Sequence, residues 1–226
     1  MEEVLDDVYE LQMPRPDLPE HLVVSRDEPI SCHLIDGETR VLLGTGYALS
    51  AASLVESIES VVDDLNGVIV EHGDSDHYGA LPQLQERFGD VTIAMPAEDV
   101  GSIVRIYAEV SVDRELVDGD SVFGLDAIAV PGHTRGNMSF LDAEKGILYV
   151  GDTFVGSDSD VALEGEWSGP FAPPAARYNA DHEAAIENLS ILSAYEFESA
   201  LLTHGSNVRS GADDAFQQLL ADIERR

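Results

Sequence analysis

The amino-acid sequence predicts an α/β fold, in which strands alternate with helices along the chain. Three observations carry this prediction. Short apolar runs rich in β-branched residues end at glycine or acidic turns, stretches with apolar residues at helical spacing follow several of these runs, and glycines mark where helices stop. The chain has 226 residues, of which 44% are hydrophobic. That length suits one core, so residues 1–226 are expected to form a single domain.

The first half of the chain contains a β-α-β unit. The segment "TRVLLGTG" (39–46) reads as a strand that ends at a glycine turn, and apolar residues over 50–65 keep helical spacing. The run "GVIV" (67–70) is the next strand, 77–89 is a short helix, and 91–95 is a further strand. The elements expected in the second half are β segments at 121–130 and 139–150, the latter a hairpin, and helices at about 181–193 and 212–226.

The composition is strongly acidic, with 44 Asp and Glu against 12 Lys and Arg and a formal net charge of −32. High salt screens the repulsion on such a surface, so a halophilic protein is expected. Nucleic acid is excluded as a partner because its binding relies on Lys and Arg. The N-terminus "MEEVLDDVYE" lacks the features of a signal peptide, and no apolar run approaches the length of a membrane span. A soluble, cytoplasmic protein with no membrane partner is therefore expected.

A few further residues are expected to have structural roles. Cys32 is the only cysteine, which excludes an internal disulfide and a cysteine-based zinc cluster, and it is expected to be a small buried residue. His21, His33 and His182 do not lie in glycine turns, and surface or capping roles are expected for them. The segment 155–180 is a candidate substrate-facing loop. Its aromatic residues Trp167, Phe171 and Tyr178 either line the substrate site or anchor a surface loop to the core.

The stretch "VIVEHGDSDHYGALPQL" (68–84) places four candidate metal ligands directly after a predicted strand. These are His72, Asp74, Asp76 and His77. In an extended segment His72 and Asp74 point the same way, whereas Asp76 and His77 fall where the chain turns into a helix. In so acidic a chain the simpler interpretation is a solvated loop. The position after a strand, where open α/β sheets bind ligands, favours a metal site.

Three later turns add to this candidate site. His133 lies in "VPGHTRGN", Asp152 in "YVGDTF" and His204 in "LLTHGS", each at a strand end in a turn of small residues. Together with the earlier stretch they offer four imidazoles and three carboxylates. Such a set suffices for two divalent ions of the zinc, iron or manganese type.

These motifs, in this order, resemble the metallo-β-lactamase fold superfamily, whose hydrolases carry His-x-His-x-Asp-His, a later His, a bridging Asp and a final His. The turn "PGHTRGN" is similar to the Pro-Gly-His-Thr-Pro-Gly turn of that family, and "VGDTF" to its bridging-Asp turn. The resemblance implies a four-layer αββα sandwich and a hydrolase similar to glyoxalase II. It also implies that a metal-bridged hydroxide attacks a small ester, thioester, lactone or amide.

The resemblance also assigns the ligands. It implies that His72, Asp74 and His133 hold one metal ion, and that Asp152 bridges. The other ligands it implies, all for the second ion, are Asp76, His77 and His204. Among these, Asp76 is oriented toward the bridging solvent and is the candidate to manage its proton.

Two departures from the family pattern alter the expectations. Asp74 stands where the family has histidine, which suits iron or manganese at least as well as zinc and resembles the flavodiiron branch, where glutamate occupies this position. Gly44 in "LLGTG" stands where the family has aspartate, so a supporting carboxylate near the site is expected to be lost.

Three functions therefore remain open for a protein acting on a small-molecule substrate. The first is a zinc-dependent dinuclear hydrolase, the second a di-iron oxidoreductase, and the third a metal-binding family member without catalysis. Tyr78 and Asn137 adjoin the motifs and are candidates either to touch substrate or to pack and close turns. The sequence leaves the oligomeric state open, and a homodimer is one of the possibilities.

Overall fold

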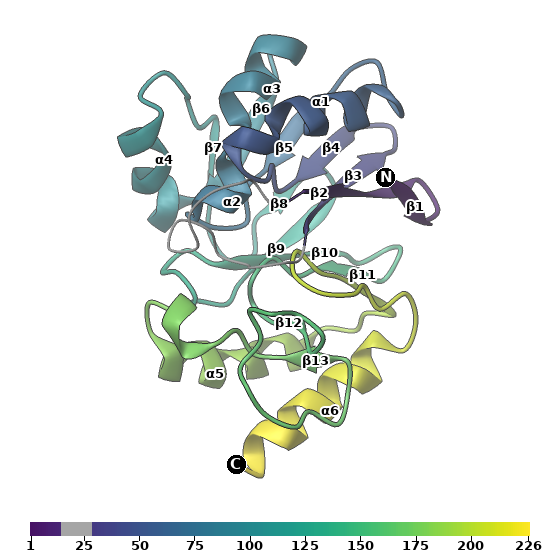
Figure 1. Cartoon of the computed structure of the whole chain (residues 1–226), viewed down its shortest axis with the longest axis vertical. Coiled ribbons are helices and arrows are strands. Elements are labelled where there is room, and N and C mark those ends of the chain that lie inside the picture. The colour runs from purple at the N-terminus through teal and green to yellow at the C-terminus, as the bar shows by residue number, and fades with distance from the viewer. Residues whose placement is uncertain (15–28) are drawn as a thin grey trace. The chain divides into compact units, whose positions relative to one another are not determined.

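The computed structural model describes residues 1–14 and 29–226, so His21 lies outside the described residues. The chain divides into two compact units, Met1–Leu116 and Val117–Arg226, each with its own sheet and helices (Figure 1). The expectation that residues 1–226 form one domain stays a prediction. Within the described residues, no helix has the length and apolar character to cross a membrane.

The first unit is built on a seven-stranded sheet whose strands lie side by side in chain order. The strands are β1 (Glu2–Leu5), β2 (Val8–Met13), β3 (Ile30–Asp36), β4 (Arg40–Leu43), β5 (Gly67–Ile69), β6 (Thr92–Pro96) and β7 (Arg114–Leu116). Strands β1 to β4 pair antiparallel, and β4 to β7 pair parallel. The parallel pairing of β5 with β6 confirms the predicted β-α-β unit.

Helices of the first unit pack on this sheet through its main hydrophobic cluster. They are α1 (Ala51–Glu59), α2 (Ser75–Tyr78), α3 (Leu81–Phe88) and α4 (Val100–Ile106), with 3-10 turns η2 (Ala48–Ser50) and η3 (Ala97–Asp99). Leu54 and Ile58 of α1 lie one turn apart and are fully buried. Helix α1 ends at Glu59, earlier than the predicted 50–65, although Val62 and Leu65 beyond it still join the core.

The predicted helix 77–89 is interrupted, because α2 and α3 are separate elements. The cause is a close backbone approach at Gly79, whose N–H donates to the carbonyl oxygen of Gly46 at 3.0 Å. A side chain at residue 79 would bring its Cβ to 2.4 Å from the amide nitrogen of Ala48. The turn therefore needs glycine, and it fixes α2 against the loop that follows β4.

The second unit is built on a five-stranded sheet in the order β14-β11-β10-β9-β8. Its strands are β8 (Ser121–Val122), β9 (Leu125–Ala129), β10 (Met138–Asp142), β11 (Ile147–Tyr149) and β14 (Ser199–Leu201), and a separate pair is formed by β12 (Val155–Gly156) and β13 (Phe171–Ala172). Strands β10 and β11 form the predicted hairpin, whose Gly146 has a φ of 66°. The last strand, β14, pairs parallel with β11.

Helices of the second unit pack on a core that contains four aromatic rings in series, those of Phe171, Phe154, Phe216 and Phe197. The helical elements are α5 (His182–Asn188), α6 (Ala212–Glu224) and the 3-10 turns η4 (Ala176–Tyr178) and η5 (Leu189–Ala194). The Asp181 side chain caps α5 by accepting from the amide of Ala184 at 3.0 Å. The predicted C-terminal helix is confirmed as α6, and its Phe216 and Leu219 are buried in this core.

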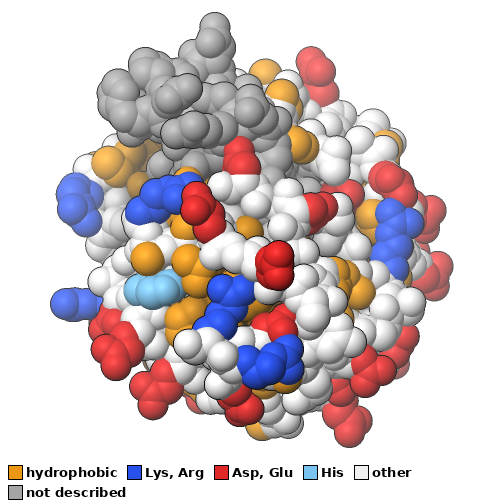
Figure 2. All heavy atoms as spheres, turned by 60° about the horizontal axis from the view of Figure 1, so that its bottom comes forward, with side chains coloured by type: hydrophobic (Ala, Val, Ile, Leu, Met, Phe, Trp, Pro, Cys, Tyr) orange, Lys and Arg blue, Asp and Glu red, His pale blue; other side chains and the backbone are white. Residues whose placement is uncertain are grey.

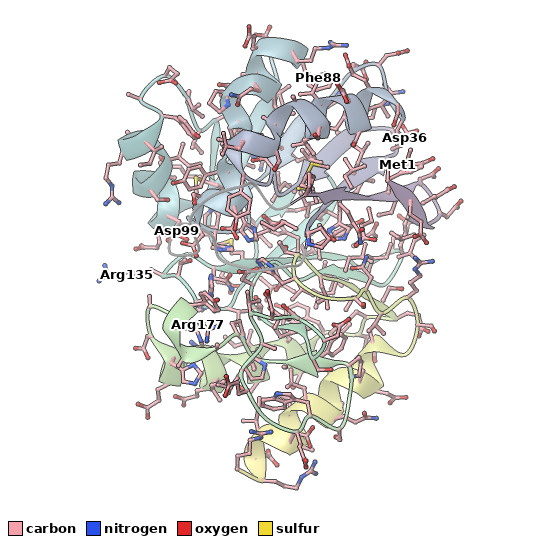
Figure 3. The ribbon with its side chains drawn as sticks, in the orientation of Figure 1. Met1, Asp36, Phe88, Asp99, Arg135 and Arg177 are labelled. Atoms are coloured by element: carbon pink, nitrogen blue, oxygen red, sulfur yellow. The ribbon has the colours of Figure 1, made fainter. Side chains whose placement is uncertain are left out.

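The aromatic residues of segment 155–180 mainly tie that segment down. The ring centroid of Phe171 lies 4.7 Å from that of Phe154, inside the core, so Phe171 is not a wall of a substrate site. The Trp167 indole donates to the carbonyl oxygen of Leu163 at 2.8 Å and is covered by the Arg226 guanidinium. Arg177, which is labelled in Figure 3, lies over the Tyr178 ring in the same way.

Candidate metal centre

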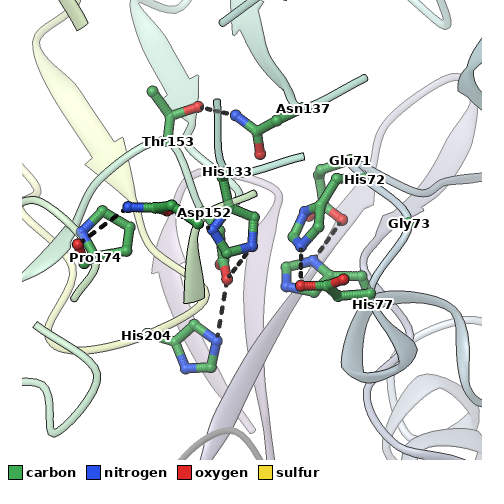
Figure 4. A network of polar contacts seen from close by, with 12 residues as sticks. Glu71, His72, Gly73, His77, His133, Asn137, Asp152, Thr153, Pro174 and His204 are labelled. Carbon is green, nitrogen blue, oxygen red and sulfur yellow. Dashed lines mark hydrogen bonds and ion pairs between the residues drawn. The ribbon is translucent and has the colours of Figure 1, made fainter. Parts of the chain in front are cut away.

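In the first unit, the four candidate ligands lie on the loop that follows β5 and on helix α2, and Figure 4 labels two of them, His72 and His77. His72, Asp76 and His77 are at most 1% exposed, whereas the Asp74 side chain is 44% exposed. The Nε2 atom of His72 lies 3.6 Å from Oδ2 of Asp74. The ring centroids of His72 and His77 are 3.9 Å apart, and a carboxylate oxygen of Asp76 lies within 4.8 Å of a ring nitrogen of His77. The predicted ligands of this stretch are therefore gathered.

The backbone of this loop is held by hydrogen bonds to two neighbouring segments and by one within the loop itself. The N–H of Gly73 donates to Oδ2 of Asp99, which is labelled in Figure 3, at 2.9 Å. Asp74 has extended backbone angles and accepts from the amide of His77 at 3.0 Å, which starts the short helix. The carbonyl oxygen of His77 accepts from the amide of Thr45 at 2.8 Å. The ligand positions are thus fixed by the fold around them.

Glu71 supports one of these ligands, and the sequence analysis did not single it out. Its Oε2 atom lies 3.1 Å from Nδ1 of His77, and the residue is only 3% exposed. Metal-binding histidines commonly donate their second ring N–H to a carboxylate, which fixes the ring and its tautomer. A carboxylate held at Nδ1 leaves Nε2 of His77 as the ring atom for a metal ion.

In the second unit, the three predicted ligands meet around Asp152. His133 follows β9, Asp152 follows β11 and His204 follows β14, and all three are at most 4% exposed. The Oδ2 atom of Asp152 lies 3.5 Å from Nε2 of His133 and 3.6 Å from Nε2 of His204 (Figure 4). The carboxyl ends of parallel strands meet at one edge of a sheet, which explains why Asp152 and His204 converge.

Two asparagines hold the turns of this second cluster. Asn137 donates through Nδ2 to the carbonyl oxygen of Val130 at 3.0 Å and to Oγ1 of Thr153 at 2.8 Å, so it links the turns that carry His133 and Asp152. Of the two roles considered for Asn137, closing a turn is the one that these contacts support. Asn179 reaches the ring of His133, with its Oδ1 atom 3.1 Å from Nδ1.

One of the remaining histidines differs from its expected role. His33 lies in β3 and is only 3% exposed, so the expected surface or capping role is wrong for it. The strand there pairs on both sides, which buries the residue. His182 opens α5 as predicted, but Asp181 provides the cap, and Nδ1 of His182 lies 2.9 Å from Nδ2 of Asn179.

The donor atoms of both clusters suit divalent metal ions. Imidazole nitrogens and carboxylate oxygens are the ligands that zinc, iron and manganese share. Hydrogen bonds at Nδ1 of His77 and His133 leave the Nε2 atom of each ring for coordination. The buried clusters are therefore consistent with a dinuclear metal site.

Comparison with known proteins gives the family and its relatives. The model of the metallo-beta-lactamase superfamily matches residues 25–204. Uncharacterized protein YobT of Bacillus subtilis is 26% identical over 206 residues, covering 82% of this chain and 87% of that protein. The probable metallo-hydrolase YflN of the same organism is 24% identical, covering 88% and 80%. The hydroxyacylglutathione hydrolase of Thermosynechococcus vestitus is 28% identical, but the match covers 61% of this chain and 57% of that enzyme.

Solved structures show the same fold. A metallo-beta-lactamase family protein of Thermus thermophilus aligns with a TM-score of 0.69 and 17% identity, covering 99% of this chain and 81% of that one. The rubredoxin oxygen:oxidoreductase of Desulfovibrio gigas aligns with a TM-score of 0.73 and 15% identity, covering the whole of this chain and 62% of that one. The predicted fold class, the αββα sandwich of this superfamily, is confirmed by the family model and these structures.

Proposed function

Because the chain belongs to the metallo-beta-lactamase superfamily, we propose that it is a metal-dependent hydrolase of a small ester, thioester, lactone or amide. The observation that carries this proposal is the position of Asp152, whose Oδ2 atom lies between the Nε2 atoms of His133 and His204. A carboxylate so placed suits the bridging role between two ions. Similarity to proteins named hydroxyacylglutathione hydrolase and probable metallo-hydrolase favours hydrolysis as the reaction class.

The proposed ligand sets follow the family motif. His72, Asp74 and His133 would hold one divalent ion, and Asp152 would bridge. The second set proposed is Asp76, His77 and His204. Two zinc ions are the first choice, with iron or manganese as alternatives because Asp74 adds a carboxylate. Bound ions of this kind lower the pKa of a coordinated water and polarise the carbonyl group of a substrate.

The chain's own side chains would position the reactants and take up the proton. Asp76 is 1% exposed and stands beside the ligand His77 on α2, so its carboxylate is proposed to accept the proton that the attacking water loses. Glu71 contacts Nδ1 of His77, and Asn179 contacts Nδ1 of His133, so both rings are held in place. With both rings held, little reorganisation is needed during the reaction.

A second candidate function rests on Asp74. Its carboxylate lies 3.6 Å from Nε2 of His72, so a set with three carboxylates is available for a di-iron centre. An oxidoreductase of that kind is the alternative to hydrolysis, and a metal-binding member without catalysis is the third candidate. The likeness to the rubredoxin oxygen:oxidoreductase shows the fold alone.

Metal analysis and one set of assays distinguish these candidates. The protein is purified without added metal, its zinc, iron and manganese are measured per chain, and hydrolysis of a model thioester and a model lactone is followed. Two zinc ions per chain with hydrolysis that is lost on chelation are the expected result. Two iron ions with visible absorption and no hydrolysis would favour the oxidoreductase, and a protein that binds no metal would refute the proposal.

A further inference from the structure

Gly44 and Glu71 face each other at the ends of two neighbouring strands. Gly44 follows β4 and Glu71 comes two residues after the end of β5, and these strands pair parallel. A Cβ atom at Gly44 would lie 3.4 Å from Oε1 and 3.6 Å from Oε2 of Glu71. The Glu71 carboxylate therefore lies in contact with the position that a side chain at residue 44 would take.

The same carboxylate also contacts a proposed metal ligand. Oε2 of Glu71 lies 3.1 Å from Nδ1 of His77, in a buried pair. The family resemblance places an aspartate at residue 44, where this chain has glycine. We infer that Glu71 replaces that carboxylate: it is the positioning residue for His77, and its presence is the reason that residue 44 is glycine.

Charge repulsion disfavours carboxylates at both positions together. An aspartate at residue 44 beside Glu71 would bring two buried carboxylates together, and like charges in a buried site repel strongly. Gly44 also has a φ of 69°, a conformation that aspartate adopts more readily than most side chains. Aspartate should therefore be tolerated at residue 44 once the Glu71 side chain has been removed.

The inference predicts how metal affinity depends on these two residues. Loss of a carboxylate that holds a ligand imidazole typically lowers metal affinity by about 10- to 100-fold. Glu71→Ala should therefore weaken zinc binding by about that factor. Gly44→Asp should also weaken binding in the wild-type background, but in the Glu71→Ala background it should restore most of the loss.

The experiment is a double-mutant cycle read out by metal binding. Zinc affinity of the full chain is measured by competition with a chromogenic chelator for the wild type, Glu71→Ala, Gly44→Asp and the double variant. Cobalt absorption spectra report the ligand geometry, and circular dichroism of each metal-free form reports the fold. Glu10→Ala is the matched control, because Glu10 is a buried carboxylate of the same unit whose Oε1 accepts from Oγ of Ser31 at 2.6 Å.

The expected result is a change of sign for Gly44→Asp between the two backgrounds, with wild-type affinity in Glu10→Ala. The inference is overturned if Glu71→Ala binds zinc like the wild type. It is also overturned if Gly44→Asp weakens binding equally in both backgrounds, or if Glu10→Ala loses as much affinity as Glu71→Ala. This inference rests on the proposed metal centre, and the two fail differently: a wild-type protein that binds no metal refutes the centre, whereas a metal-loaded, active Glu71→Ala variant refutes only the role of Glu71.

Discussion

The amide of Asn179 joins two histidines of the second unit. Its Oδ1 atom lies 3.1 Å from Nδ1 of His133, and its Nδ2 atom lies 2.9 Å from Nδ1 of His182. An amide oxygen accepts hydrogen bonds and an amide nitrogen donates them. Because Oδ1 of Asn179 faces His133, the His133 ring is oriented with its N–H on Nδ1. The Nε2 atom, which lies 3.5 Å from Oδ2 of Asp152, is then left for the proposed metal ion.

Asn179→Ala should lower the affinity for zinc by about tenfold, because the His133 ring loses the group that orients it. Asn179→Asp should preserve the affinity, since a carboxylate also accepts from Nδ1. The measurement is chelator competition, with Asn66→Ala as a control that removes an amide whose Oδ1 accepts from the backbone N–H of Arg40. Equal affinities for Asn179→Ala and the wild type would show that the ring is held by other contacts.

His77→Ala and Asp152→Ala should each remove metal and reduce hydrolysis to the background rate. The sequence alone suggests that such turn residues can be changed without cost to the core, but both are at most 3% exposed, so a modest loss of stability is expected as well. Metal per chain, hydrolysis and the melting temperature are measured together. His33→Ala is the control, because it removes a buried imidazole of the first unit that belongs to neither cluster.

Much of the fold was predictable because its signals are local. The apolar run of β5, the hairpin of β10 and β11 and the buried stripe of α6 each follow from the spacing of neighbouring residues. The exceptions depend on contacts that spacing does not encode. The helix predicted over 77–89 is divided because Gly79 packs against the backbone of Gly46 and Ala48, more than thirty residues earlier in the chain.

The candidate site divides in the same way. The seven proposed ligands lie in short motifs with strand ends before them, so their gathering within each unit could be predicted. Their supports could not, because Asn179 reaches His133 from 46 residues away. Glu71 is adjacent to His72 in the sequence, but the sequence does not show that its side chain faces Gly44. The expectation that a supporting carboxylate is lost with the family's aspartate at residue 44 is therefore wrong, because Glu71 provides one at His77.

Cys32 should resist alkylation in the folded protein and react after unfolding. It is fully buried, and burial, together with the nearby charges of Glu71 and Asp76, raises the pKa of its thiol well above the usual value. The unfolded chain ionises its thiol above about pH 8.5. The folded state does so only at higher pH, so stability is lost as pH rises above that value. Mass spectrometry after iodoacetamide treatment measures the alkylation, and rapid labelling of the native protein would contradict the first expectation. Melting temperatures of wild type and Cys32→Ala between pH 7 and 10 measure the loss of stability.

Lowering the salt concentration should destabilise the protein. Among the described residues six acidic side chains are buried, namely Glu10, Glu71, Asp76, Asp99, Asp152 and Asp222. The others are at least partly exposed, and Figure 2 shows many of them spread over one face of the molecule. At about 0.01 M salt the screening length grows to about 30 Å, so their repulsion is hardly screened. Melting temperatures in molar and 0.01 M potassium chloride that agree would rule out salt adaptation.

Asp74 is the ligand candidate whose role most affects the choice of metal. Its side chain is 44% exposed, unlike the other proposed ligands, yet its Oδ2 atom lies 3.6 Å from Nε2 of His72. If Asp74 is a ligand, Asp74→Ala should reduce the metal content from two ions to about one per chain. Asp74→His should keep two ions and shift the preference from iron and manganese toward zinc, because imidazole is the softer ligand.

The measurement is metal content after equilibration with equal concentrations of zinc, iron(II) and manganese(II) under anaerobic conditions. Glu98→Ala is the control, because Glu98 is an exposed acidic residue of the same unit, on the 3-10 turn η3 rather than on the ligand loop. Wild-type and Glu98→Ala proteins should bind the same metals in the same amounts. If Asp74→Ala also keeps two ions per chain with an unchanged preference, Asp74 is one more solvated carboxylate of an acidic surface, and another residue must complete the set of His72 and His133.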